Sequence, residues 1–308
     1  MPAPDFLIIG PPKCGTTALY AVLAQHPQVS MSRIKEPYFF AFDGQPPAFV
    51  GPGAEHYRRT AITSWDAYQA LFADRGEHLV RGEASPLYLT SYQPERTAAN
   101  IHRRLPDARL IAILRQPAER AYSQFTYRRQ QGFEPLADFR QALAAEERRI
   151  AANWPPACRY WRNSLYFTHL TPYFALFPRE QIRVYLYDDL VSEPQALLAD
   201  LCAFLGIEPS LLPVQMERIN VTTWTRSRVI DWLLRHSRRL SAWAPAALRQ
   251  QIGRRLRAWN QVKPPPLDPI LRRELTTSYR DEIGHLQALI SCDLSHWLNQ
   301  HEAEAQSV

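Results

Sequence analysis

The stretch that decides the fold lies near the start of the chain and reads Phe6-Leu7-Ile8-Ile9-Gly10-Pro11-Pro12-Lys13-Cys14-Gly15-Thr16-Thr17. Its first four residues form a continuous apolar run, which predicts a short buried strand of a parallel sheet. The loop Gly10–Gly15 then leads into a helical pattern that begins at Thr16 and is closed by His26-Pro27. A strand, a glycine loop and a helix in this order predict the start of a βαβ unit.

Similar apolar runs recur along the chain and alternate with helical patterns. Strands are predicted at 78–83, 108–114 and 182–187, and helices at 98–105, 117–131, 134–151, 164–177 and 194–205. This alternation predicts an α/β, P-loop-like fold of three layers, in which helices flank a central, mostly parallel sheet. Ligands bind beyond the carboxyl ends of such strands, so we expect Gly10–Thr17, Glu83–Pro86 and Arg115 to converge in space.

The character of the sequence changes after residue 222. Residues 222–262 are rich in Arg and Trp and carry apolar positions at helical spacing, which predicts a C-terminal helical cap or insert. Lys263-Pro264-Pro265-Pro266 interrupts this pattern before a last predicted helix at 268–289. The expected organisation is a single domain over residues 1–300, which contains the cap, and a flexible tail at 301–308.

Composition excludes several classes of protein. The chain has 308 residues, of which 46% are hydrophobic and 21% charged, as is typical of a globular rather than a disordered protein. No apolar run approaches the roughly 18–20 residues that span a bilayer. Few residues precede Phe6, so we expect no signal peptide. The cysteines are far apart and form no CxxC pair, so we expect no zinc site and predict a cytoplasmic protein.

The net charge is basic, with 36 Lys and Arg against 30 Asp and Glu and a formal value of +6. Such an excess permits a nucleic-acid partner, but the basic residues are spread along the chain. We recognise neither a helix-turn-helix nor a basic groove studded with aromatic residues, and we therefore predict no nucleic-acid partner. Nearly all of the basic residues are arginines, so the lysine within the glycine loop, Lys13, stands out.

The loop at residues 10–17 is similar to a phosphate-binding loop but departs from that of a kinase. Its two glycines have the spacing of GxxxxGK[ST], and N–H groups of the loop and of the following helix would hold a phosphate. The kinase lysine should follow the second glycine, where this chain has Thr16. The lysine lies inside the loop, at Lys13, which suits a donor with one 5′-phosphate and a transferable group beyond it. A P-loop small-molecule kinase is the alternative, and Thr16 disfavours it.

These residues resemble those of the sulfotransferases that use 3′-phosphoadenosine-5′-phosphosulfate (PAPS). The loop of that family reads like Gly-x-x-Lys-x-Gly-Thr-Thr, and residues 10–17 match it. A second signature of the family is a strand that ends in Arg, followed eight residues later by Ser, and Arg115 and Ser123 match it. Lys35-Glu36-Pro37-Tyr38-Phe39-Phe40 is similar to a motif of the bacterial branch related to the glycan (heparan-type) sulfotransferases.

The resemblance implies PAPS as the donor, adenosine 3′,5′-bisphosphate (PAP) as the product, and no requirement for a metal. It implies three catalytic residues, of which Lys13 stabilises the departing phosphate, Glu36 is the base and Glu83 lines the acceptor site. A glutamate that is merely exposed or caps a helix is the alternative for Glu36. The residues implied to hold the donor are Pro12, Lys13, Cys14, Gly15, Thr16, Thr17, Arg115, Ser123, Arg226 and Arg228. Arg226 and Arg228 rest on a weaker signature, because an ordinary solvated basic stretch fits the same residues.

The acceptor is less constrained than the donor. The resemblance implies a hydroxyl, less often an amine, on a glycan, a lipid, a carrier-bound molecule or another natural product. Glycan enzymes often carry a lysine where this chain has Ala84, so a highly sulfated acceptor does not follow. The basic segment 222–262 is either a cap with solvated arginines or a surface that meets an acidic partner or an anionic membrane. We hypothesise that it shapes the acceptor pocket.

Overall fold

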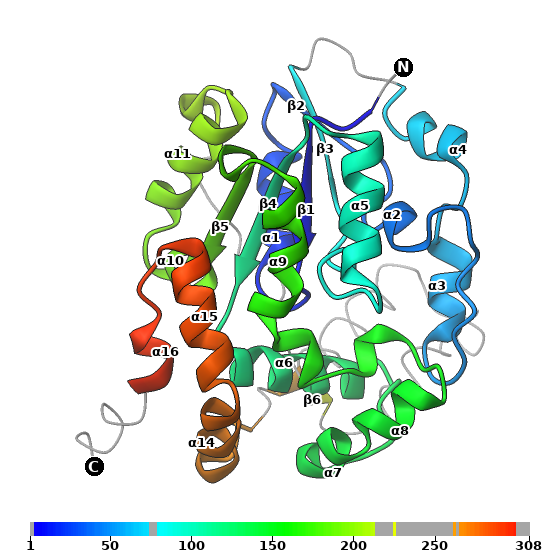
Figure 1. Ribbon diagram of the computed structural model, residues 1–308, viewed down its shortest axis with the longest axis vertical. Coiled ribbons are helices and arrows are strands. Elements are labelled where there is room, and N and C mark those ends of the chain that lie inside the picture. The colour runs from blue at the N-terminus through cyan, green and yellow to red at the C-terminus, as the bar shows by residue number, and fades with distance from the viewer. Residues whose placement is uncertain (1–2, 74–78, 213–223, 226–260, 263–264, 300–308) are drawn as a thin grey trace, which may run out of the picture.

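The computed structural model describes residues 3–73, 79–212, 224–225, 261–262 and 265–299, and helices pack on both faces of its central sheet (Figure 1). The five strands of this sheet lie in the order β2-β3-β1-β4-β5, and each neighbouring pair is parallel. Their bounds are β1 Phe6–Gly10, β2 Val29–Met31, β3 Val80–Ala84, β4 Arg109–Leu114 and β5 Ile182–Leu186. The predicted three-layer α/β fold with a parallel sheet is confirmed.

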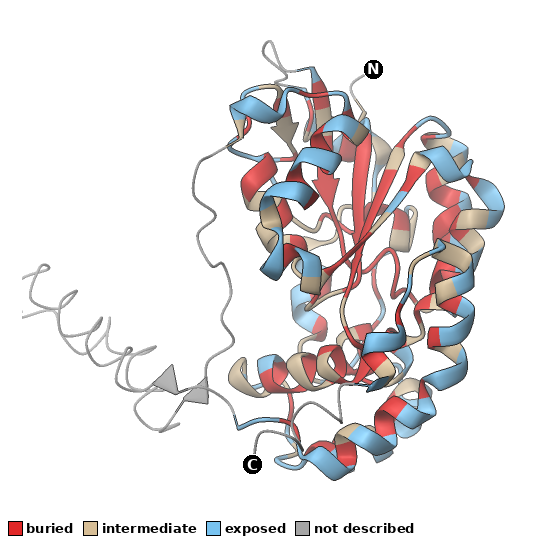
Figure 2. Cartoon of the chain, turned by 90° about the vertical axis from the view of Figure 1, so that its left-hand side faces the viewer, coloured by how far each residue is buried: buried red, intermediate tan, exposed pale blue. Residues whose placement is uncertain are grey.

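Strand β1 lies at the centre of the sheet and is buried along its whole length. Successive side chains of a strand point to opposite faces. Phe6 and Ile8 therefore pack with α1 (Thr16–Leu23) and α11 (Pro194–Leu205). Leu7 and Ile9 pack on the other face, in the cluster that also contains Ala98, Leu170 and Leu286. Burial on both faces explains why the sequence of β1 is continuously apolar, and Figure 2 shows the buried strands between the helical layers.

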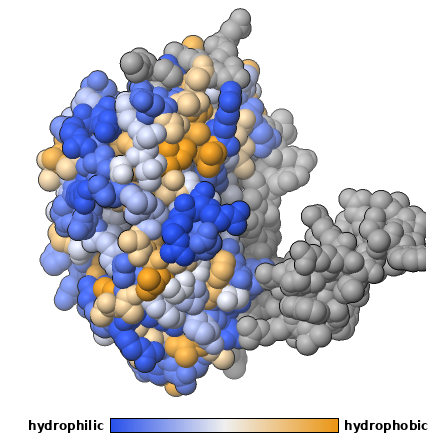
Figure 3. Space-filling model, turned by 90° about the vertical axis from the view of Figure 1, so that its right-hand side faces the viewer, coloured by the Kyte–Doolittle hydropathy of each residue, from blue (hydrophilic) through white to orange (hydrophobic). Residues whose placement is uncertain are grey.

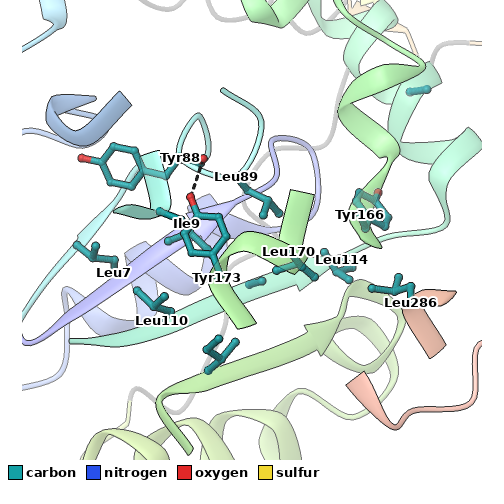
Figure 4. Close-up of a cluster of buried hydrophobic side chains, with 14 of the residues drawn as sticks. Leu7, Ile9, Tyr88, Leu89, Leu110, Leu114, Tyr166, Leu170, Tyr173 and Leu286 are labelled. Carbon is teal, nitrogen blue, oxygen red and sulfur yellow. Dashed lines mark hydrogen bonds between the residues drawn. The ribbon is translucent and has the colours of Figure 1, made fainter. Parts of the chain in front are cut away.

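Helix α9 (Tyr166–Leu176) covers the second face of the sheet. Figure 4 shows Leu170 and Tyr173 of this helix against side chains of β1 and β4. The hydroxyl of Tyr173 donates a 2.8 Å hydrogen bond to the carbonyl oxygen of Tyr88. This bond ties α9 to the segment that follows β3, and thereby fixes one wall of the site described below.

The remaining helices surround these layers, and several of them match the predicted ranges. The patterns at 98–105, 117–131 and 194–205 correspond to α5, α6 and α11. The bounds of the helices not yet given are α2 Phe39–Phe42, α3 Ala54–Thr60, α4 Trp65–Ala70, α5 Pro94–Arg104, α6 Pro117–Gln130, α7 Phe139–Ala144, α8 Glu146–Ala151, α10 Tyr187–Ser192, α14 Pro269–Ser278, α15 Arg280–Ile290 and α16 Ser295–Asn299.

Two of the long helices predicted from the sequence are interrupted. The range 134–151 holds α7 and α8, which are separated at Ala145. Helix α7 begins only at Phe139, because Pro135 disfavours a helix before it and the Asp138 side chain caps α7 by accepting the N–H of Gln141 at 2.8 Å. The range 268–289 holds α14 and α15, which are separated at Tyr279. Helices α2 to α4 and strand β2 were not predicted, because they are too short to show a period in the sequence.

The segment 222–262 is described only at its two ends. There β6 (Trp224–Thr225) and β7 (Gln261–Val262) form an antiparallel pair. The rest of the expected helical cap lies outside the described residues, as do Arg226, Arg228, Lys263 and the tail at 301–308.

The surface combines hydrophilic and hydrophobic side chains. Hydrophilic residues cover much of the face seen in Figure 3, and smaller hydrophobic areas lie among them. In the part of the chain that the structure describes, no helix is both long and apolar enough to cross a membrane.

We predict that Gly82→Ala lowers the free energy of unfolding by about 1–3 kcal/mol. A Cβ atom at Gly82 would lie 2.0 Å from Cζ of Phe6, whose ring is fully buried in the centre of the sheet. Gly284→Ala in α15 is the matched control, because a Cβ there meets no atom within 4 Å. Alanine should stabilise that helix by up to about 1 kcal/mol. Urea denaturation of both variants measures the difference, and a Gly82→Ala protein as stable as the wild type would contradict this packing.

Candidate active site

A cavity of about 1460 Å³ lies at the carboxyl ends of the central strands. Its lining includes residues 12–18, except Cys14, from the segment after β1. It also includes Pro86, which follows β3, and Arg115, which follows β4. The three sequence regions expected to converge therefore do so. A pocket for one small molecule is typically about 300–1,000 Å³, so this cavity has room for a nucleotide and a second substrate.

The loops after β1 and β3 approach each other closely at Gly10. Gly10 has a φ of +125°, a conformation that other residues rarely adopt. A Cβ atom at this position would lie 2.5 Å from the carbonyl oxygen of Pro86. Glycine at position 10 is therefore required both by the backbone conformation and by the packing of the two loops that form the site.

The phosphate-type loop ends at the start of α1. Gly15 is the N-cap residue and adopts a φ of 101°, while Thr16 and Thr17 are the first helical residues. The first turn has no acidic side chain, so the unpaired N–H groups and the positive end of the helix dipole are available for an anion. Cys14 does not line the cavity. Its thiol is fully buried 3.9 Å from the Tyr166 hydroxyl, and this burial raises the pKa of Cys14 to about 11.

Lys13 projects into the cavity from the middle of the loop. It has a φ of 73°, and its ammonium group lies 4.0 Å from the centre of the Tyr127 ring. Burial lowers the pKa of Lys13 to about 8, and the positive charge of Arg115 adds to this effect. A cation that is partly desolvated and close to another cation is well suited to binding an anionic group.

Arg115 and Ser123 line the same cavity as Lys13. Arg115 follows β4 directly, and its guanidinium lies 5.0 Å from the centre of the Tyr187 ring and 3.5 Å from the carboxylate of Glu119. Ser123 lies two turns into α6. The structure thus brings together the two residues of the second sequence signature and the loop that carries the first.

Glu36 also lines the cavity, in a segment with strained backbone. Glu36 and Tyr38 have φ values of 64° and 59°, which are uncommon for residues other than glycine. The backbone N–H of Glu36 donates to the carbonyl oxygen of Ala84 at 3.0 Å and so attaches this segment to the end of β3. Strained backbone of this kind is concentrated at functional sites, and Lys13 is a third example in the same cavity.

The carboxylate of Glu36 is held by two neighbours. Nζ of Lys35 donates to Oε1 at 2.6 Å, and the hydroxyl of Tyr38 donates to Oε2 at 2.5 Å. The same hydroxyl lies 3.5 Å from Nε2 of His56. These contacts orient Glu36, while each carboxylate oxygen keeps a lone pair for a substrate. Burial and the charge of Glu36 raise the pKa of Tyr38, so its hydroxyl stays a donor.

Glu83 lies in β3 behind the cavity rather than in its wall. The residue is fully buried, and burial raises its pKa to about 7. The hydroxyls of Tyr68, Tyr88 and Ser85 are close enough to oppose this rise in part. However, no group of the described residues has both the distance and the angle of a hydrogen bond to either carboxylate oxygen of Glu83. The position gives Glu83 no direct contact with a molecule in the cavity.

Several lining residues were given no role by the sequence analysis. Tyr38 lies inside the Lys35–Phe40 motif, where its hydroxyl contact with Glu36 could have been suspected from the spacing. Tyr127 and Glu119 lie on the helix that follows Arg115. His56 and Arg272 are brought to the cavity by tertiary packing, and nothing in the sequence marks them.

Comparisons with known proteins agree with the geometry. A family model described as "Sulfotransferase family" matches residues 4–210. The solved sulfotransferase from Alicyclobacillus acidocaldarius is 30% identical with a TM-score of 0.76, and the match covers 96% of this chain and 99% of that chain.

Two relatives with curated names are much longer than the matched part of this chain. Bifunctional heparan sulfate N-deacetylase/N-sulfotransferase 2 of Bos taurus is 32% identical in an alignment of 216 residues that covers 68% of this chain and 22% of the relative. Carbohydrate sulfotransferase 15 of Mus musculus is 28% identical in an alignment of 250 residues that covers 67% of this chain and 44% of that protein. The match to the family model and the similarity to the Alicyclobacillus acidocaldarius structure lead to one conclusion: the chain belongs to the sulfotransferase family.

Proposed function

We propose that the protein transfers a sulfonate group from PAPS to a hydroxyl, or less often an amine, by in-line displacement. The observation that carries this proposal is the position of Lys13, inside the glycine loop and in one cavity with Arg115 and Glu36. A P-loop kinase is not favoured, because Thr16 occupies the place of the kinase lysine.

The donor would lie along the half of the cavity formed by the glycine loop, α1 and α6. The N–H groups of Gly15, Thr16 and Thr17 and the ammonium of Lys13 would hold the 5′-phosphosulfate. Arg115 and Ser123 would hold the 3′-phosphate, since a guanidinium fork and a hydroxyl are complementary donors for a terminal phosphate. Pro12 would contribute packing and Cys14 its backbone, because its thiol is buried. Arg226 and Arg228 remain predicted contacts of the 3′-phosphate and lie outside the described residues.

The chemical step would use Glu36 and Lys13 at opposite ends of the reacting group. The acceptor oxygen attacks sulfur, its proton passes to the carboxylate of Glu36, and the bond from sulfur to the bridging oxygen of the 5′-phosphate breaks. The electron pair of that bond stays on the bridging oxygen, where the ammonium of Lys13 stabilises the charge that develops. Glu83 stays a predicted acceptor-site residue. Because it lies behind the cavity, any effect on the acceptor would be transmitted by its neighbours.

The acceptor would occupy the half of the cavity around Glu36. Around Glu36 the lining is rich in rings, because the Tyr38 hydroxyl donates to the Glu36 carboxylate and its ring lies against His56 and Tyr57. The lining of the cavity also includes Thr60, Leu87, Thr90, Tyr127 and Phe133. Such a lining suits the flat face of a sugar or of another ring that bears hydroxyl groups. The names of the relatives include heparan sulfate and carbohydrate, which supports a glycan or a similar hydroxylated molecule as the acceptor class. A lipid or a carrier-bound natural product is the alternative acceptor.

The proposed setting is the cytoplasm. All four cysteines are free thiols in the structure, and Cys14, Cys158 and Cys202 are buried in the core. Thiols of this kind persist in a reducing compartment.

Incubation with PAPS and a panel of hydroxylated and aminated acceptors tests the proposal. Mass spectrometry should detect PAP together with a product that is heavier than its acceptor by one sulfonate group. ATP with Mg²⁺ in place of PAPS should give no phosphorylated product. Phosphorylation in the second reaction and no sulfonated product in the first would refute the assignment.

The lowered pKa of Lys13 predicts how PAP affinity depends on pH. The free protein loses the Lys13 proton as the pH rises through about 8, whereas bound phosphate favours the charged ammonium. The affinity of the wild type for PAP should therefore fall from about pH 7 to about pH 9. Lys13→Arg keeps its charge over this range and should show no such fall, and Lys13→Ala should bind weakly at every pH. Calorimetric titration measures this, and an identical pH profile for wild type and Lys13→Arg would contradict it.

The proposed role of Glu36 predicts a loss of rate rather than of donor affinity. Glu36→Gln should lower kcat by about 10²- to 10⁴-fold, because a general base contributes that much to a proton transfer. PAP affinity should change little. Glu55→Gln is the matched control, since Glu55 forms an exposed ion pair with Arg58 and does not line the cavity. Steady-state rates with an acceptor from the panel provide the test, and a fully active Glu36→Gln enzyme would remove Glu36 as the base.

A further inference from the structure

Glu119 lies between two arginines in the donor half of the cavity. Its Oε2 is 3.5 Å from Nη2 of Arg115, and its Oε1 is 3.1 Å from Nε of Arg272. All three side chains line the cavity. Each is partly buried, with 25% of the Arg115 side chain, 26% of Glu119 and 16% of Arg272 exposed. Two guanidinium groups and one carboxylate thus form a compact charged cluster where the donor is expected to bind.

Arg272 reaches this cluster because α14 packs against α6. The Tyr122 hydroxyl of α6 donates to the carbonyl oxygen of Pro265 at 2.9 Å, just before α14. Nε2 of Gln116, the N-cap residue of α6, donates to Oγ1 of Thr276 at 3.0 Å. These two bonds flank the position of Arg272 along the chain. They hold its side chain over the first turn of α6, the turn that contains Glu119.

We propose that Arg272 is a second guanidinium of the site for the donor's 3′-phosphate, and that the Glu119 carboxylate occupies this site until the phosphate displaces it. The inference rests on the proposed function, which assigns Arg115 to the same phosphate. In the free protein Glu119 separates two like charges that would otherwise repel each other. Because its side chain is partly exposed, it can turn towards water when the ligand enters.

The charges of the groups support this assignment. A phosphate monoester carries about −1.5 to −2 charges near neutral pH and has three acceptor oxygens. Two guanidinium groups balance this charge, and their forks match the oxygens. Among the described residues, Arg115 alone would leave about 0.5 to 1 negative charge without a partner in a partly buried place. The pair Arg115 and Arg272 should therefore distinguish nucleotides that carry a 3′-phosphate from those that do not.

A simpler role for the cluster has a different consequence. Arg272 and Glu119 could instead serve only to attach α14 to α6. Loss of Arg272 would then lower the stability of the protein and would weaken the binding of every adenine nucleotide to the same extent. Selectivity for the 3′-phosphate would then be unchanged. The effect of an Arg272 substitution on the affinities for two nucleotides, one with and one without a 3′-phosphate, therefore distinguishes a binding role from a structural one.

Calorimetric titration with PAP and with adenosine 5′-monophosphate (AMP), which lacks the 3′-phosphate, tests the proposal on the full-length protein. Arg272→Gln should weaken PAP binding by about 10- to 100-fold. Its effect on AMP should stay within about twofold. Arg272→Lys should be intermediate for PAP, and Glu119→Gln should bind PAP more tightly than the wild type. Arg273→Gln is the matched control, because Arg273 is the next residue of α14, is exposed and does not line the cavity.

The possible results are distinguishable. Unchanged PAP affinity in Arg272→Gln, or an equal loss for PAP and AMP, would overturn the role of Arg272 and leave the proposed function standing. A wild type that binds PAP no more tightly than AMP would overturn the proposed function and this inference together. If Arg272→Gln does not fold, Arg272→Lys and Glu119→Gln decide the matter, and PAP affinities equal to that of the wild type in both would overturn the proposal.

Discussion

The parallel pairing of β1 with both β3 and β4 is the constraint on which the rest of the structure depends. Parallel strands place their carboxyl ends at one edge of the sheet, so the segments after β1, β3 and β4 meet there. Two glycines permit this arrangement. Gly82 leaves space for the Phe6 ring within the sheet, and Gly10 leaves space for Pro86 at its edge. The pairing of the strands then brings Lys13 of the glycine loop and Arg115 after β4 to one cavity, although they lie about a hundred residues apart in the sequence.

The electrostatics of this edge complement an anionic ligand. Arg120 of α6 is fully buried, and it donates to Oγ of Ser164 at 2.6 Å and to the carbonyl oxygen of Tyr160 at 2.5 Å. Within the described ranges no carboxylate forms an ion pair with it. Its charge acts on Lys13 in the same direction as that of Arg115. Burying positive charge is unfavourable in the free protein, and a bound anion would offset part of that cost. A phosphorylated donor therefore suits this cavity better than a neutral ligand does.

Much of the fold and of the donor site could be predicted from the sequence, for identifiable physical reasons. Strands buried on both faces leave continuous apolar runs, as at Phe6–Ile9, and the glycine loop between β1 and α1 is a local feature. The acceptor half could not be predicted in the same way. His56 reaches Tyr38 from a short helix without a readable period. One part of the donor half was missed for a similar reason, because Arg272 reaches Glu119 from α14, more than a hundred residues away in sequence. The burial of Glu83 behind the cavity depends on how β3 packs and not on its motif.

The most direct test of this account is the binding of PAP in the presence of a metal chelator, compared with the binding of ATP and Mg²⁺. The account predicts one molecule of PAP bound per chain with the chelator present, and weaker binding of ATP with or without Mg²⁺. Calorimetric titration gives both affinities and the stoichiometry. Tight binding of ATP that depends on Mg²⁺, with no detectable binding of PAP, would contradict the central claim that this sheet edge is built for a 3′,5′-bisphosphate nucleotide.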